Sequence, residues 1–174
     1  MKNLIIFYSR RGQNYSDGGI KNLELGNTEI VAEFIKDAIG GTLFEIETEK
    51  QYSLDYYKCT EEAKEELKTN ARPKLKNYIK TIDEYNNIFI CGPCWWGTFP
   101  MAMFTQLETL DWDGKNIFAV VTHGGSGFGN CERDLIKTCK GAKLGKGLAI
   151  FGSQASNSKD EVFNWAQNVV KSLL

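Results

Sequence analysis

Hydrophobic and polar positions follow one another along the chain in an order that predicts strands and helices in turn. Continuous apolar runs at 3–8, 88–92, 117–121 and 148–151 are typical of strands covered on both faces, and a short strand is also expected around 43–46. Polar or glycine-rich residues end these runs, and nowhere does an apolar stretch reach membrane-spanning length. Five buried strands are therefore expected.

Amphipathic segments lie between these strands and predict helices. Asn27 or Thr28 can cap a first helix, in which apolar residues recur at helical spacing until Gly40-Gly41 ends it. Four further helices are predicted, near 55–69, 101–110, 130–139 and 159–173. Residues 70–85 stay mostly unassigned, and 13–25 is a long insertion between the first strand and its helix.

This alternation predicts an α/β fold with a doubly wound, five-stranded parallel sheet of order 2-1-3-4-5 and helices on both faces. One domain spanning residues 1–174 is expected, because the chain is of single-domain length and has no repeat, linker or low-complexity tract. Ligands bind such sheets at the carboxyl ends of the strands beside the switch point. The loops after the first, third and fourth strands should therefore converge on a site.

Charge narrows the classes of partner. The chain has 21 Lys and Arg against 22 Asp and Glu, a formal net charge of −1. No global positive field exists to attract nucleic acid or an anionic membrane, so small molecules and proteins are the expected partners. The N-terminal apolar run is too short for a signal peptide, which predicts a cytoplasmic protein whose five cysteines are reduced thiols.

The first loop carries features suited to a phosphate. Gly26-Asn27-Thr28 stands just before the first helix, where free backbone N–H groups and the helix dipole favour an anion. The hydroxyls of Ser9 and Thr28 can add donors, and Arg10 and Arg11 are candidates to pair with the charge. The alternative is an ordinary helix cap. Neither a P-loop nor a G-x-G-x-x-G fingerprint follows the first strand, so a single terminal phosphate fits best.

The second loop begins with a C-x-x-C motif, Cys91-Gly92-Pro93-Cys94, whose four residues are those of the thioredoxin active centre. Thiol–disulfide exchange needs the first cysteine at a helix N-terminus, where the dipole lowers the thiol pKa. Gly97 and Pro100 would break a helix starting here. Trp95 and Trp96 cannot both point into one core, so one is expected to offer its face to a ligand, or else to a protein interface.

The third loop, Thr122-His123-Gly124-Gly125-Ser126-Gly127-Phe128-Gly129, has four glycines in six residues, which let backbone amides come close to a ligand's edge. A plain flexible turn is the alternative reading of such a loop. His123 is the only histidine of the chain, so a histidine-rich metal site is unsupported.

The three loops together resemble those of the flavodoxin family, and the likeness spans essentially the whole chain. The matching residues are Ser9 with Gly26-Asn27-Thr28, then Gly92-Pro93-Cys94-Trp95-Trp96-Gly97, and Thr122-His123-Gly124-Gly125-Ser126-Gly127. The resemblance implies a flavodoxin-like fold and one noncovalent FMN, with its phosphate near Ser9 and Thr28. The isoalloxazine ring would lie between the second and third loops, against Trp95 or Trp96.

Family members carry electrons between reductases and acceptor proteins, so the resemblance also implies redox partner proteins of both kinds. Two departures stand out: the insertion at 13–25 interrupts the phosphate loop, and the chain is nearly neutral whereas flavodoxins are usually strongly acidic. The predicted cofactor-binding residues are Ser9, Arg10, Arg11, Asn27, Thr28, Pro93, Cys94, Trp95, Trp96, Gly97, Thr122, His123, Gly124, Gly125, Ser126 and Gly129.

An FMN-binding electron-transfer protein is thus the first hypothesis, with the redox chemistry supplied by the cofactor and no protein nucleophile required. The nearest alternative is an FMN-dependent NAD(P)H:quinone-type reductase, in which a substrate occupies the exposed ring. Two alternatives need no flavin: a thioredoxin-like dithiol protein using Cys91 and Cys94, and a cofactor-free interaction domain on the same scaffold.

Overall fold

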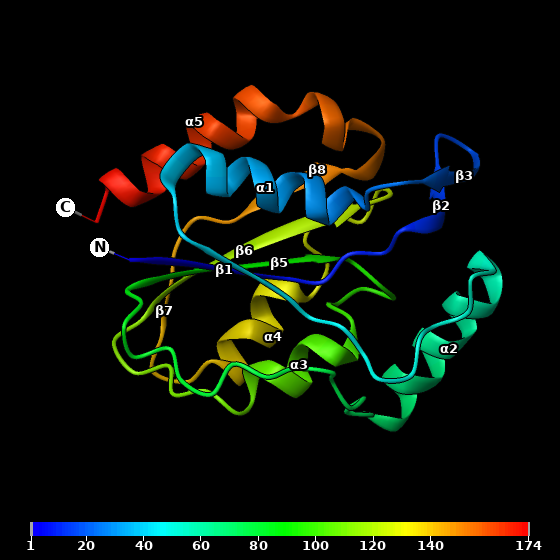
Figure 1. Ribbon diagram of the computed structural model, residues 1–174, viewed down its shortest axis with the longest axis horizontal. Coiled ribbons are helices and arrows are strands. Elements are labelled where there is room, and N and C mark those ends of the chain that lie inside the picture. Colours follow the sequence, from blue (N-terminus) through cyan, green and yellow to red (C-terminus); the bar gives the residue numbers. More distant parts are fainter. Residues whose placement is uncertain (1, 174) are drawn as a thin grey trace.

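A parallel β-sheet lies at the centre of the molecule (Figure 1). The structure is a computed structural model that describes residues 2–173. The strands of the sheet in spatial order are β4 (Thr42–Glu45), β1 (Asn3–Phe7), β5 (Asn87–Pro93) and β6 (Asn116–His123), followed by β7 (Lys143–Leu144) and β8 (Leu148–Phe151), which both pair with β6. All pairings in this sheet are parallel. The predicted α/β class and the strand order 2-1-3-4-5 are confirmed.

The sheet has six strands rather than the predicted five, because its last position is divided into two pieces. β7 pairs with the start of β6 and β8 with its end. Between them, Gly147 passes so close to β6 that a Cβ there would lie 2.8 Å from the Ala119 carbonyl oxygen. A strand of only two residues, β7, has no periodicity that a sequence pattern could reveal.

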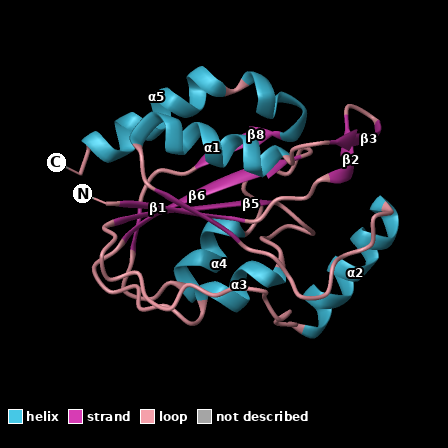
Figure 2. Ribbon diagram, in the orientation of Figure 1, coloured by secondary structure: helices cyan, strands magenta, loops and turns pink. Residues whose placement is uncertain are grey.

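Helices cover the sheet in two layers (Figure 2). Alternate residues of the central strands pack against one layer or the other. Ile5 of β1 and Phe89 of β5 pack in a cluster with α1 (Asn27–Ile39) and α5 (Lys159–Lys171). Their neighbours Leu4 and Ile90 pack on the other side, in a cluster with α3 (Met101–Leu107) and α4 (Cys131–Thr138). Because both faces are covered, β1 is apolar throughout except for the buried Asn3 at its start.

Helix α2 (Tyr56–Thr69) stands apart from these layers, beyond the carboxyl ends of the strands (Figure 1). Asp55 caps it by accepting a hydrogen bond from the Lys58 amide at 2.9 Å, and Asn70 ends it in the left-handed conformation. The five predicted helices are all present, although α3 ends at Leu107 rather than near 110. No helix among residues 2–173 is long and apolar enough to cross a membrane.

The insertion at 13–25, left without a role by the sequence pattern, forms a β-hairpin. β2 (Gly12–Ser16) and β3 (Gly19–Leu23) pair antiparallel and are joined by Asp17 and Gly18, which both have positive φ. A two-residue turn with positive φ at both positions is the type I′ hairpin turn, and Asp-Gly is one of its preferred sequences. The hairpin lies beside α2 at the same end of the sheet (Figure 1).

The unassigned stretch 70–85 contains neither helix nor strand, although Leu75 makes an isolated bridge to Thr48. The buried Gln106 of α3 holds it in place: its side chain accepts a hydrogen bond from the Ile79 amide at 2.8 Å and donates one to the Ile79 carbonyl at 3.1 Å. After β8, the 3-10 helix η1 (Gly152–Asn157) leads into α5.

Candidate functional site

The carboxyl ends of β1, β5 and β6 surround a cavity of about 280 Å³. The three loops singled out in the sequence all contribute to its walls, as the topology requires. The hairpin, the start of α2 and the end of β8 complete it. Ten predicted site residues line it: Ser9, Arg10, Asn27, Thr28, Pro93, Cys94, Trp95, Thr122, His123 and Gly124.

The N-terminus of α1 is capped from outside the helix. Asn27 and Thr28 were the predicted caps, but they are the first two residues of α1, and the cap position belongs to Gly26. The Ser9 hydroxyl accepts a hydrogen bond from the Glu29 amide at 3.0 Å and so supplies the side-chain cap that glycine lacks. A side chain at position 26 would collide with that hydroxyl and lie 2.7 Å from the Arg10 carbonyl oxygen. Only glycine fits this crossing.

A buried pair of hydroxyls joins the first loop to the third. The side chains of Thr28 and Thr122 are hydrogen-bonded at 2.7 Å, and both residues line the cavity. Since the first amides of a helix have no partner within it, the N–H groups of Asn27 and Thr28 stand ready for an anion at this wall.

The two arginines of the first loop have different surroundings. Arg10 lines the cavity, but its guanidinium donates to the Gln13 carbonyl at 2.8 Å and to the Leu54 carbonyl at 3.0 Å. It therefore links the hairpin to the segment before α2.

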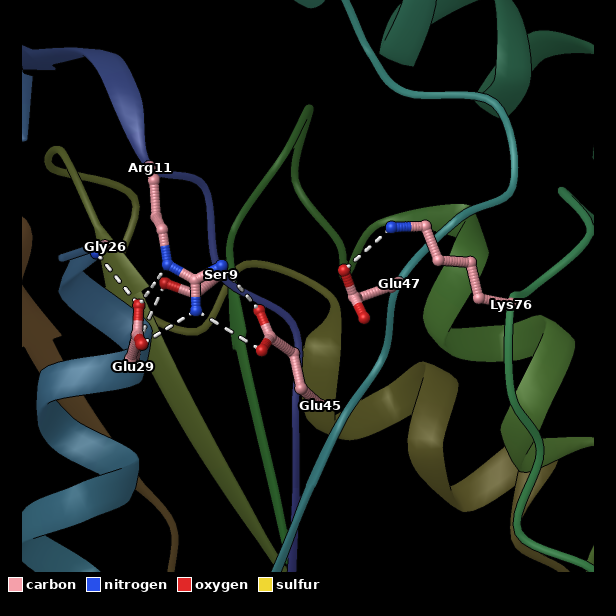
Figure 3. A network of polar contacts seen from close by, with 7 residues as sticks. All are labelled: Ser9, Arg11, Gly26, Glu29, Glu45, Glu47 and Lys76. Carbon is pink, nitrogen blue, oxygen red and sulfur yellow. Dashed lines mark hydrogen bonds and ion pairs between the residues drawn. The ribbon is translucent and has the colours of Figure 1, made fainter. Parts of the chain in front are cut away.

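Arg11 does not line the cavity, and its side chain joins two carboxylates (Figure 3). Its guanidinium lies 2.8 Å from Glu29 of α1 and 3.1 Å from Glu45 of β4, and the hydrogen bond to Glu29 is the main reason its pKa is raised. Arg11 thus connects α1 to β4 through two ion pairs.

The second loop makes a tight turn. Trp96 and Gly97 have φ values of 52° and 86°, while Trp95 and Thr98 exchange two backbone hydrogen bonds across them. This is again a type I′ arrangement, here with a bulky residue in the left-handed region, where strain is expected. The Gly97 carbonyl accepts a hydrogen bond from the Asn130 amide at 2.6 Å, which fixes the second loop against the third.

The two tryptophans separate, as the sequence required. Trp95 is half-buried and packs edge-on against Tyr8 and Tyr52, with ring centroids 5.2 and 5.4 Å apart. Trp96 is 49% exposed, and its indole N–H donates to the Thr60 carbonyl of α2 at 2.8 Å. Trp95 lines the cavity and Trp96 does not.

The C-x-x-C cysteines do not form a dithiol site. Cys91 lies inside β5, not at a helix N-terminus, and is fully buried in the cluster of α1 and α5, which raises its thiol pKa. Cys94 packs against the opposite cluster. Interaction with the Cys131 thiol is the main reason that the pKa of Cys94 lies below that of an ordinary thiol. All five cysteines are free.

In the third loop, His123 is buried and packs on Phe151, with ring centroids 4.4 Å apart. Its Nδ1 accepts a hydrogen bond from the Gly125 amide at 3.0 Å, which requires that nitrogen to be unprotonated. Burial lowers the pKa of His123, so the neutral ring is favoured. Among residues 2–173, nothing lies within 4 Å of a Cβ built on Gly124 or Gly125, so this loop presents bare backbone to open space.

Comparison with known proteins identifies the family. The sequence model of the flavodoxins matches residues 24–169, most of the chain. The chain belongs to the flavodoxin family. The comparison with curated proteins finds no match.

Solved structures agree with this flavodoxin fold. A candidate flavoprotein from Bacteroides uniformis is 27% identical, with a TM-score of 0.76 over 95% of this chain and 97% of that one. A Lactobacillus acidophilus flavoprotein in complex with FMN is 21% identical, with a TM-score of 0.64 over 92% and 97%. Bacillus cereus flavodoxin 2 is 20% identical, with a TM-score of 0.55 over 99% of both chains. The last two show the shared fold.

The cavity of this flavodoxin suits FMN in three respects. Helix amides and the Thr28 hydroxyl are donors for a phosphate, Trp95 offers an aromatic surface, and the open backbone of the third loop offers amides and carbonyls to a ring edge. Trp96, Gly97, Gly125, Ser126 and Gly129, which were predicted for the site, lie on the loops around the cavity rather than in its wall.

Sequence reasoning missed several wall residues of the cavity. Tyr15 and Ser16 come from the hairpin, Tyr56 from α2, and Gly152 and Ser153 from the start of η1. The Asp17-Gly18 dipeptide was the signal that could have revealed the hairpin. No local signal marks Tyr56 or Gly152, because the wrapping of the chain brings them to the cavity.

Proposed function

We propose that this flavodoxin binds FMN noncovalently at the cavity and works in electron transfer. Membership of the family supports FMN as the cofactor, and bound FMN supplies the redox chemistry. The observation that carries the proposal is the convergence of three loops on one cavity, where the N-terminus of α1 meets the Thr28–Thr122 pair.

The residues of the chain then bind and orient the cofactor. The amides of Asn27 and Thr28 and the Thr28 hydroxyl address the phosphate, in the positive end of the α1 dipole. Trp95 flanks the ring, and the backbone of Gly124 and Gly125 reads its edge. His123 is neutral, so it places no positive charge beside the isoalloxazine ring. In this proposal reductase and acceptor proteins are the partners, and the cytoplasm is the compartment.

A reductase that turns over small molecules is the second candidate function. It is favoured by one specific feature, a large second cavity that shares walls with the first. The dithiol function loses support, since Cys91 is buried on the opposite side of the sheet from Cys94.

The visible spectrum of the freshly purified protein, with titration of the stripped protein by FMN, FAD and riboflavin, tests the proposal. We expect bound oxidised flavin, released as FMN on denaturation, and a preference for FMN over riboflavin. A colourless protein that binds none of the three flavins would overturn it. Steady oxidation of NAD(P)H by the pure protein would favour the reductase, and its absence would favour the carrier.

A further inference from the structure

The His123 side chain has one ring nitrogen that the fold uses and one that it leaves free. Nδ1 accepts a hydrogen bond from the Gly125 amide at 3.0 Å, so the proton of the neutral ring is on Nε2. In the part of the chain that the structure describes, no group bonds to Nε2, and no buried side-chain nitrogen or oxygen lacks a partner. Nε2 is therefore not sealed in the core, and its N–H can donate to a ligand.

The end of β6 directs this donor to the side of the sheet where Trp95 lies. Successive residues of a strand point to opposite faces. Thr122 bonds to the Thr28 hydroxyl of α1, whereas Val121 packs in the cluster with α3 and α4. The ring that follows Thr122 is therefore on the Val121 side, opposite the Thr28–Thr122 pair. Trp95 packs against this same cluster.

The imidazole is held in place before any ligand arrives. β6 and β8 pair with His123 opposite Phe151, and the two side-chain rings pack with centroids 4.4 Å apart. Only 9% of His123 is exposed, yet the residue lines the cavity. The contacts with Phe151 and Gly125 fix both the ring and its tautomer, so binding a ligand costs this donor little conformational freedom.

The donor at Nε2 suits a neutral acceptor better than a phosphate. Burial lowers the pKa of His123, so the ring has no charge with which to attract an anion. The hydroxyls and helix amides that suit a phosphate lie at the Thr28–Thr122 pair, on the other face. The isoalloxazine ring carries carbonyl oxygens along its pyrimidine edge, and the open backbone at Gly124 and Gly125 leaves room for that edge.

We infer that His123 binds the flavin of the proposed function, on which this inference rests, by donating a hydrogen bond from Nε2 to a pyrimidine carbonyl oxygen of the isoalloxazine ring. Gly125 is then a positioning residue, because its amide selects the tautomer with the proton on Nε2. With the proton on Nδ1, the ring would turn a lone pair toward the carbonyl oxygen and repel it.

Two substitutions separate the roles of the two ring nitrogens. His123→Asn keeps an acceptor near Nδ1 for the Gly125 amide but does not reach as far as Nε2, whereas His123→Gln keeps an N–H donor at about the reach of Nε2. We expect His123→Asn to weaken FMN and riboflavin alike, about two- to tenfold, the usual worth of a neutral hydrogen bond. His123→Gln should lose less. Fluorescence titrations of the stripped proteins measure both affinities.

Lumiflavin, which has the ring without the ribityl phosphate, tests where on the flavin the contact lies. It should show the same difference between His123→Asn and His123→Gln. A difference confined to FMN would place the contact at the phosphate and overturn the inference.

NMR of the imidazole nitrogens of the parent protein gives a measurement that needs no substitution. The chain has one histidine, so the ring signals belong to His123. We expect the proton on Nε2 in both the stripped and the FMN-loaded protein, and slower exchange of this proton with water once FMN is bound.

Equal losses in the two variants, unchanged affinity in both, or a larger loss in His123→Gln would overturn the inference, because a donor at Nε2 would then not matter. An Nε2 proton whose exchange is the same with and without FMN would also overturn it. A parent protein that binds neither FMN nor riboflavin contradicts the proposed function itself. A parent that binds both but fails these tests contradicts the role of His123 alone.

Discussion

At the scale of single residues, the Thr28 hydroxyl has a position that tests the phosphate site. It is buried and bonded to Thr122, at the second residue of α1. We expect Thr28→Val to weaken FMN about ten- to a hundredfold and riboflavin hardly at all, because a hydrogen bond to a charged group contributes roughly 1.5–3 kcal/mol. Titrations of both flavins measure the ratio.

Thr122→Val is the control for this change, because it removes the same internal hydrogen bond without removing the Thr28 donor. Its effect should be similar for FMN and riboflavin. Equal losses for the two flavins in Thr28→Val would contradict a phosphate role for this residue.

Cys94 gives a pH-dependent prediction at the same scale. Its pKa is lowered mainly by interaction with the Cys131 thiol, and the thiolate is the reactive form. Alkylation by iodoacetamide should therefore persist below the ordinary thiol midpoint of about 8.5 and fall only at lower pH. Rates followed by mass spectrometry across pH give the midpoint.

In Cys131→Ala the midpoint of Cys94 should rise, since the main stabilising contact of the thiolate is lost. Cys59 is an internal reference, because burial raises its pKa to about 11 and its alkylation should need alkaline pH. A Cys94 midpoint equal to that of an unfolded thiol would rule out this assignment.

At the scale of elements, Arg11 joins α1 to β4 through Glu29 and Glu45, whose side chains are only 14% and 27% exposed (Figure 3). We expect Arg11→Met to lower the free energy of unfolding by about 0.5–1 kcal/mol, the upper range for a partly exposed pair. The loss should shrink at high salt, where the charges are screened. Urea unfolding at two salt concentrations measures both.

Lys2→Met is a suitable comparison, because the Lys2–Glu84 pair is 67% and 59% exposed and should contribute less. FMN affinity should be similar in Arg11→Met and the parent protein, since Arg11 does not line the cavity. A selective loss of FMN over riboflavin in Arg11→Met would instead return Arg11 to the phosphate site.

At the scale of the whole molecule, the cofactor cavity is made by segments far apart in the chain, so ligand binding should stabilise the entire fold. FMN at a hundred times its dissociation constant should add about 2.7 kcal/mol. For a chain of this size, that corresponds to a rise in Tm of roughly 5–10 °C. Thermal melts of the stripped protein with and without FMN measure the rise, and an unchanged Tm at saturating FMN would contradict binding to the folded state.

The order of strands and helices could be predicted from the sequence because it depends on local patterns. Burial on both faces makes a parallel strand apolar throughout, and helical spacing marks a helix that covers it. β1, β5 and β6 were accordingly found within a residue or two, and their order followed from the rules of crossover connections. β7 was missed because two residues carry no period.

The sequence by itself determined the fold, the family and the three loops that meet at one edge of the sheet. The strands, helices and loop motifs each depend on contiguous residues, and the strand order follows from the rules of crossover connections. Tertiary structure alone decided which groups within those loops reach the cavity. Ser9 rather than Asn27 or Thr28 caps α1, Arg11 turns away to two carboxylates, and Tyr56 reaches the wall from α2. These outcomes depend on distances between segments remote in the chain, which local periodicity does not encode.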